Sequence, residues 1–184
     1  APVATMIRIT FLREDEGHTA DLLRDGTAMA AVTTERTPVQ GCTVESLGAM
    51  RYRPIASAAF AARWFAGGVT PDALRHAPVV VFDDRDRLQI DRLAEAGIAW
   101  GRAPWHTVPA TTQFSEAVRL GYGWGMLPDL EGRAWAGIDL SAVSGSCLGV
   151  HDVMLSWQQW SLRTGSLDAV ADALREGAAR SLLR

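Results

Sequence analysis

Short apolar runs alternate with amphipathic stretches along the whole chain, and this pattern predicts a mixed α/β protein. Strands are expected where apolar residues run continuously or alternate with polar ones, over residues 6–12, 27–34, 44–56, 78–82, 105–109, 124–127 and 150–160. Helices are expected where apolar residues recur at helical spacing, over residues 15–24, 58–65, 88–96, 114–120 and 166–183, with a further short helix after Thr70. Because helices and strands alternate throughout, the pattern predicts two small α/β lobes.

The stretch from residue 109 to residue 128 has the clearest local order, because a strand end, a helix and a second strand follow one another. Thr111 or Thr112 is expected to cap the helix, since a hydroxyl group there can accept an unpaired N–H of the first turn. A parallel strand–helix–strand unit also presents the helix N-terminus at the carboxyl ends of the strands, where ligands bind. The two threonines therefore either face a small anionic group or only cap the helix.

Acidic residues stand before two other predicted helices and have the same two interpretations. Glu14 and Asp15 precede the first helix, and Asp86 precedes the helix over residues 88–96. A carboxylate at a helix N-terminus interacts favourably with the helix dipole, so no ligand is needed to explain it. Asp86 follows a buried parallel strand, and Glu14 or Asp15 can face a cleft, so each can also attract a ligand cation.

Composition narrows the classes of function that remain. The chain has 184 residues, of which 48% are hydrophobic and 21% are charged, as in a globular domain. Its net charge of -3 gives no basic surface for nucleic acid, so this chain is not expected to hold DNA through phosphate contacts. No apolar run reaches the roughly 20 residues of a membrane span. Cys42 and Cys147 are too few for a disulfide framework, and both are expected to be reduced.

The motifs of catalysis and metal binding are not convincing. The spacing Gly121-x-Gly123-x-Gly125 follows a helix and enters a strand, which is the reverse of the order in a dinucleotide-binding fingerprint. The four histidines are isolated from one another and from the cysteines, so a metal centre has little support. Cys147 and His151 are too far apart along an extended chain to form a nucleophile–base pair. We therefore expect no enzyme activity, no metal and no cofactor.

The chain is expected to cross between the two lobes twice. Residues 1–56 form the first part of lobe I, residues 57–140 form lobe II, and residues 141–184 return to complete lobe I. A cleft between the lobes is the default ligand site of such an architecture. The first residues already read as a strand within a fold and include no initiating Met, so the chain is expected to be part of something longer.

Four segments carry a resemblance to a known family. They are AVTTERTPVQGC (residues 31–42), LGAMRYRPIAS (47–57), LGYGWGMLP (120–128) and WQQW (157–160). In this order and at these separations, they resemble the effector-binding domain of LysR-type transcriptional regulators. More narrowly, they resemble the LysG/ArgP-like branch, which controls the export of basic amino acids.

The resemblance implies a type 2 periplasmic-binding-protein-like fold, with the effector bound in a cleft between two small α/β lobes. It also implies that the first strand and helix of lobe I are absent from this chain. The effector-lining residues implied position by position are Glu14, Asp15, Thr33, Thr34, Ser57, Asp86, Thr111 and Thr112. Relatives tend to have an acidic residue at the position of Thr112, so a cationic effector must find its carboxylate partner at Glu14, Asp15 or Asp86.

The function implied is that of a cytoplasmic sensor of a basic amino acid, lysine, arginine or histidine, that controls transcription of an amino-acid exporter gene. The implied partners are copies of the same chain in dimers and tetramers, in which the helix over residues 15–24 meets the partner's helix over residues 114–120. Promoter DNA is contacted only through an N-terminal helix-turn-helix domain that this chain does not contain, and no membrane is involved. Two other classes fit a similar scaffold: a secreted amino-acid-binding protein, and a small enzyme with a strongly shifted titration in its cleft.

Overall fold

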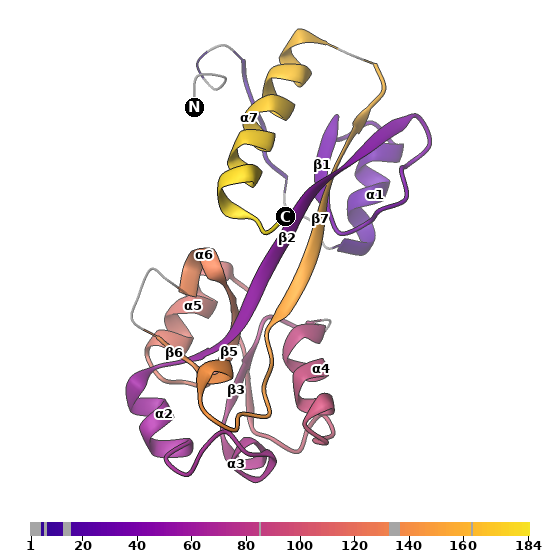
Figure 1. Cartoon of the computed structure of the whole chain (residues 1–184). Coiled ribbons are helices and arrows are strands. Elements are labelled where there is room, and N and C mark those ends of the chain that lie inside the picture. Colours follow the sequence, from indigo (N-terminus) through magenta and orange to yellow (C-terminus); the bar gives the residue numbers. More distant parts are fainter. Residues whose placement is uncertain (1–4, 6, 13–15, 85, 133–136, 163) are drawn as a thin grey trace. The chain divides into compact units, whose positions relative to one another are not determined.

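A computed structural model describes residues 5, 7–12, 16–84, 86–132, 137–162 and 164–184. The chain divides into two compact units, which we call unit 1 (residues 1–50 and 152–184) and unit 2 (residues 51–151). Each unit is described by itself, with the element labels of Figure 1.

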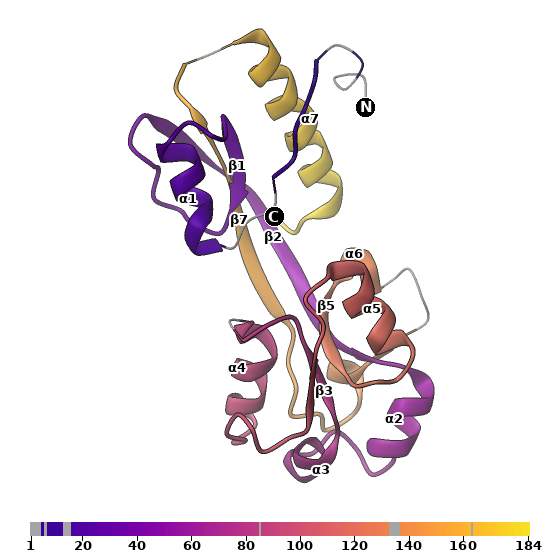
Figure 2. The same ribbon diagram turned by 180° about the vertical axis from the view of Figure 1, so that it is seen from behind.

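Unit 1 is a small sheet with a helix on either side. Its elements are α1 (Glu16–Arg24), β1 (Ala30–Thr33), the first part of β2 (Cys42–Ala56), β7 (His151–Trp160) and α7 (Gly165–Ser181). In the strand order, β7 lies between β1 and β2, and Ala31 of β1 stands opposite Gln158 of the antiparallel β7. Helices α1 and α7 lie on opposite sides of these strands in both views (Figures 1 and 2). Leu167 and Ala171 of α7 pack against Trp157, which buries the apolar stripe predicted for the last helix.

The first predicted strand is wrong within the described residues. Residues 7–12 have no strand pairing, and the side chain of Phe11 is 89% exposed. Alternating apolar residues become a strand only when a neighbouring strand pairs their backbone N–H and C=O groups. No other segment in the described part of the chain pairs with residues 7–12, so their apolar pattern does not form a strand.

Unit 2 is built around a short parallel sheet. Its elements are the second part of β2, α2 (Ala58–Trp64), α3 (Pro71–His76), β3 (Val79–Val81), α4 (Arg87–Glu95), β4 (Trp105–Thr107), α5 (Thr111–Arg119), β5 (Gly125–Pro128), α6 (Asp129–Gly132), β6 (Ile138–Asp139) and the 3₁₀ helix η2 (Leu140–Ala142). Strand β3 pairs in parallel with β4, and Val79 also forms a parallel bridge to Trp124, next to β5. The parallel strand–helix–strand unit is thus confirmed, with β3 between its two strands. On the other side of β5, β2 runs antiparallel.

The core of unit 2 explains why α5 occupies a fixed position. Val80 lies on the sheet face covered by Phe114 and Val118 of α5, whereas Val79 belongs to the core on the other face, with Leu93 of α4. A methyl group at Gly125 would lie 3.0 Å from both Phe114 and Val118, so α5 packs onto β5 at a place where only glycine leaves room. The first turn of α5 is consequently held at the edge where β3, β4 and β5 end.

The strand expected over residues 44–56 is present as β2, whereas the helix α6 was not predicted at all. Helix α6 has only four residues, and its sequence DLEG contains too few apolar positions for a periodicity to be visible.

Candidate functional site

The carboxyl edge of the parallel sheet in unit 2 gathers several of the residues selected from the sequence. Val108 N donates to Val81 O at 2.9 Å, so the chain leaves β3 and β4 at the same edge. Asp86 follows β3, and Thr111 and Thr112 follow β4. This is the edge at which an open α/β sheet binds ligands.

Asp86 caps α4, as its sequence position predicted. Its Oδ1 accepts from Leu88 N at 3.1 Å and its Oδ2 accepts from Phe82 N at 3.0 Å. The pKa of Asp86 is nevertheless raised, because burial of the carboxyl group outweighs these two hydrogen bonds, and Asp83 adds a like charge. A half-buried carboxylate with unused lone pairs can bind a cation, and a cation there would relieve the cost of burial. Beside it on α4, Gln89 is 1% exposed, and its Oε1 has no hydrogen-bond partner among the described residues.

Helix α5 begins without a side-chain cap, which corrects the expectation for its two threonines. The N-cap position is Ala110, and Thr111 and Thr112 are the exposed first two residues of the helix. By contrast α2, α3 and α4 each begin with a serine, threonine or aspartate side chain that accepts a hydrogen bond from the first turn. The first-turn N–H groups of α5 therefore point out with the positive end of the helix dipole, beside two hydroxyl groups, an arrangement suited to a carboxylate.

Ser57 is not brought together with Asp86, Thr111 and Thr112. It caps α2, where its Oγ accepts from Phe60 N at 3.3 Å. A methyl group at Gly121, which follows the last turn of α5, would lie 3.1 Å from the Ser57 Oγ. Nine residues of helix span about 13 Å, so Ser57 lies by the opposite end of α5. The antiparallel course of β2 carries residue 57 to the other edge of the sheet, and the role in effector binding that the family resemblance implies for Ser57 stays a prediction.

The other selected residues belong to unit 1. Thr33 is buried, and its Oγ1 accepts from Glu35 N at 3.1 Å, while Thr34 is half-buried. Both stand where β1 ends and a loop over residues 34–41 begins. Glu14 and Asp15 lie outside the described residues.

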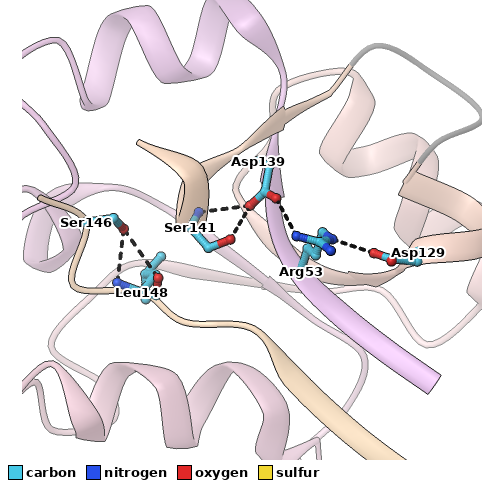
Figure 3. A network of polar contacts seen from close by, with 6 residues as sticks. All are labelled: Arg53, Asp129, Asp139, Ser141, Ser146 and Leu148. Atoms are coloured by element: carbon cyan, nitrogen blue, oxygen red, sulfur yellow. Dashed lines mark hydrogen bonds and ion pairs between the residues drawn. The ribbon is translucent and has the colours of Figure 1, made fainter. Parts of the chain in front are cut away.

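Two further features of the site were missed from the sequence. Arg53 on β2 donates from Nε to Asp129 at 2.6 Å and from Nη1 to Asp139 at 3.0 Å, which ties the end of β5 to β6 (Figure 3). Hydrogen bonds and opposite charge, mainly from Asp129 and to a smaller extent from Asp139, raise the pKa of Arg53. The second feature is Gln158 on β7, whose side chain holds the loop after β1. The signal available for Gln158 was a polar residue in the middle of an apolar strand.

The described residues at this edge offer hydrogen-bond donors and a carboxylate. Within the described residues, no three His, Cys, Asp or Glu side chains are grouped as metal ligands. In the same part of the chain, no helix is both long and apolar enough to cross a bilayer. Cys42 and Cys147 are free thiols in different units, and burial raises the pKa of both.

A mixed α/β chain with helix N-termini at the carboxyl edge of a parallel sheet has the architecture of a periplasmic-binding-protein-like domain. Residues 6–179 match the model of the LysR substrate binding domain, and the chain belongs to this family. It is 42% identical over 172 residues to the HTH-type transcriptional regulator LysG of Mycobacterium tuberculosis, covering 90% of this chain and 54% of that protein. The chain thus spans about half the length of the curated relatives it matches.

Solved structures agree with this assignment. Full-length LysG of Corynebacterium glutamicum with bound effector Arg superposes with a TM-score of 0.82 at 34% identity, covering 99% of this chain and 62% of that one. ArgP of Mycobacterium tuberculosis gives a TM-score of 0.79 at 39% identity, covering 99% and 63%. The relatives are named as transcriptional regulators, and the LysG/ArgP branch inferred from the four sequence segments is confirmed.

Proposed function

We propose that this chain is the effector-binding part of a LysG/ArgP-type transcriptional regulator that senses a basic amino acid, with lysine, arginine and histidine as the candidates. The observation that carries the proposal is the likeness to Corynebacterium glutamicum LysG, whose structure holds arginine as its effector. The rest of the regulator, including a DNA-binding helix-turn-helix domain, is proposed to lie outside this chain. The regulated gene is proposed to encode an amino-acid exporter.

The described residues support a division of roles in the site. The uncapped first turn of α5, with Thr111 and Thr112, supplies N–H and hydroxyl donors for the α-carboxylate of the effector. Asp86 supplies a half-buried carboxylate for a cationic group. Thr33 and Thr34 of unit 1, with Glu14 and Asp15, are proposed as effector-lining residues from the family resemblance alone.

Binding is proposed to act by shifting a population of conformations that already exist. The protein is proposed to work in the cytoplasm as a homodimer or tetramer, in which α1 of one subunit meets α5 of its partner. A change in the arrangement of the subunits would then change how the paired DNA-binding domains sit on the promoter. The effector need only bind one arrangement more tightly than the other to produce this change.

Calorimetric titration of the purified protein tests the effector class. L-lysine, L-arginine and L-histidine are each compared with L-leucine, which shares the α-carboxylate and α-amine but lacks the side-chain cation. Saturable binding of a basic amino acid and none of leucine is the expected result. Binding of leucine at equal affinity would contradict the basic-amino-acid assignment while leaving the family intact.

A matched pair of variants tests the role of Asp86. Asp86→Asn removes the charge and keeps a residue that caps helices well, so the effector should bind at least tenfold more weakly. Asp72→Asn removes the same charge from the first turn of α3, where the side chain is 84% exposed, and should bind as the wild type does. Equal affinity of the two variants would exclude Asp86 as the partner of the effector cation.

A further inference from the structure

Gln158 is a buried amide that spans the loop after β1. Its side chain is 1% exposed in the middle of β7, opposite Ala31 of β1. Its Oε1 accepts from Val39 N at 3.0 Å, and its Nε2 donates to Thr37 O at 3.0 Å and to Glu35 O at 3.3 Å. Both N–H groups of the amide and its oxygen are thus used on one short stretch of backbone.

The loop has little else to determine its shape. Residues 35–38 are exposed, and Val39 is the buried exception, with 6% of its surface accessible. A turn of backbone without its own apolar contacts keeps one conformation only when its polar groups are paired. The pairing here comes from a side chain that is 119 residues away in sequence from Val39.

We propose that Gln158 is a positioning residue for effector binding: by fixing residues 35–39 it holds Thr33 and Thr34 in their binding arrangement. This inference rests on the proposed function of the two threonines. Thr33 is linked to this loop through Glu35. The Thr33 Oγ1 accepts a hydrogen bond from Glu35 N, and the carbonyl oxygen of Glu35 accepts one from Gln158 Nε2. Loss of the amide releases the loop into several conformations, of which only a fraction binds the effector, and apparent affinity falls by that fraction.

The neighbouring Gln159 provides a matched control. It is also buried, with 8% of its surface accessible, but its Oε1 accepts from Trp157 Nε1 at 2.7 Å, within the same strand. Adjacent residues of a strand point to opposite faces, so Gln159 lies on the face away from the loop. Methionine at either position removes a buried amide and keeps a side chain of similar volume. Gln158→Met leaves three backbone groups of the loop without their partner, whereas Gln159→Met leaves only Trp157 Nε1. Gln158→Met should therefore lose more stability, and affinities are compared under conditions in which both variants are folded.

The first experiment compares the Gln158→Met and Gln159→Met variants of the purified protein. Calorimetric titration with L-lysine, L-arginine and L-histidine should give a roughly tenfold weaker affinity for Gln158→Met and an affinity within about twofold of wild type for Gln159→Met. Hydrogen exchange at the Val39 amide should accelerate in Gln158→Met alone. Equal affinities in the two variants, or wild-type affinity in Gln158→Met, would overturn the inference. Absence of binding by the wild-type protein would instead refute the proposed function, and the inference with it.

A third variant distinguishes positioning of the loop from general loss of structure. In Gln158→Glu, an ionised carboxylate still accepts from Val39 N but repels the carbonyl oxygens of Glu35 and Thr37. Protonation at lower pH restores one donor, so the affinity of Gln158→Glu relative to wild type should recover as pH falls. A ratio that stays constant with pH would show that the donor bonds to the loop do not set affinity. If Gln158→Met fails to fold, the pH dependence of Gln158→Glu still tests whether the hydrogen bonds of residue 158 to the loop set the affinity for the effector.

Discussion

Replacing Gly48 by alanine is expected to destabilise unit 1 by about 3 kcal/mol. Gly48 lies in β2 with a φ of 119°, outside the range that side chains favour. A methyl group there would overlap with Leu183 O and lie 3.2 Å from Leu182 Cβ. Leu183 cannot move aside without loss, because its backbone forms two hydrogen bonds with Ala49, of 2.8 and 2.9 Å.

The magnitude follows from two separate costs. A side chain at a positive φ costs roughly 1 kcal/mol relative to glycine. Displacing the segment after α7 breaks both hydrogen bonds to Ala49, each contributing about 1 kcal/mol net. The apolar contribution is small because Leu183 is 39% exposed.

The variant Gly41→Ala measures the cost of a side chain at a positive φ without a steric clash. Gly41 has a φ of 86°, and a methyl group there would meet no atom within 4 Å. Its alanine variant should lose only about 1 kcal/mol. The difference between the two variants therefore measures the clash and the lost bridge, without the backbone strain that they share.

Urea unfolding of the two alanine variants, followed by tryptophan fluorescence, gives the two free energies of unfolding. Shortening the chain to end at Leu182 removes the carbonyl that clashes, so Gly48→Ala should cost much less in the shortened chain than in the complete one. Equal destabilisation by Gly41→Ala and Gly48→Ala, or no coupling between Gly48→Ala and the shortening, would refute the assignment of the loss to the bridge with Leu183.

Two further outcomes follow from the charged groups. Arg53→Met should lose about 1–3 kcal/mol because it removes the cation that is hydrogen-bonded to two half-buried carboxylates. Arg175→Met should lose less than about 1 kcal/mol because its carboxylate partners are largely exposed. Equal losses in urea unfolding would contradict this reasoning. Burial raises the folded pKa of Asp86 above 3.8, so the stability that Asp86 contributes relative to Asp86→Asn is greatest below that pH and declines as pH rises through the raised pKa. Unfolding curves of the wild type and of Asp86→Asn at several pH values show whether this stability difference declines as the pH rises.

The sequence predicted most strongly those elements whose signals are local. Helix α7 follows from a long apolar stripe, and α3 and α4 follow from the caps Thr70 and Asp86, which the structure confirms. The strand over residues 6–12 was wrong because strand formation depends on a neighbour, which a hydrophobic pattern does not contain. The same reason explains why Gln158 was overlooked: its partners are more than a hundred residues away in sequence.

The sequence predicted which candidate residues follow the parallel strands, but not the position of every candidate residue in the fold. Asp86, Thr111 and Thr112 were found because residues that follow parallel strands reach one edge of the sheet. Ser57 was implied by the family resemblance as a residue where the chain crosses between lobes, and because β2 is antiparallel to β5 it lies at the other end of α5. Strand direction is a tertiary property, and a sequence pattern alone did not distinguish the two edges.

The uncapped start of α5 gives the strongest physical reason to look for a carboxylate there. The two threonines are good capping residues, yet the helix begins one position earlier than they require, at Ala110, and leaves its first N–H groups without a side-chain acceptor. The neighbouring helices α2, α3 and α4 show that this unit supplies such acceptors readily. A missing cap costs roughly 1 kcal/mol of helix stability in the free protein, and a bound carboxylate returns that stability in the complex. Part of the proposed affinity would thus come from the helix itself, and a variant that installs a cap, Ala110→Asp, should weaken effector binding while raising the melting temperature. An unchanged affinity in that variant would show that α5 does not receive the carboxylate.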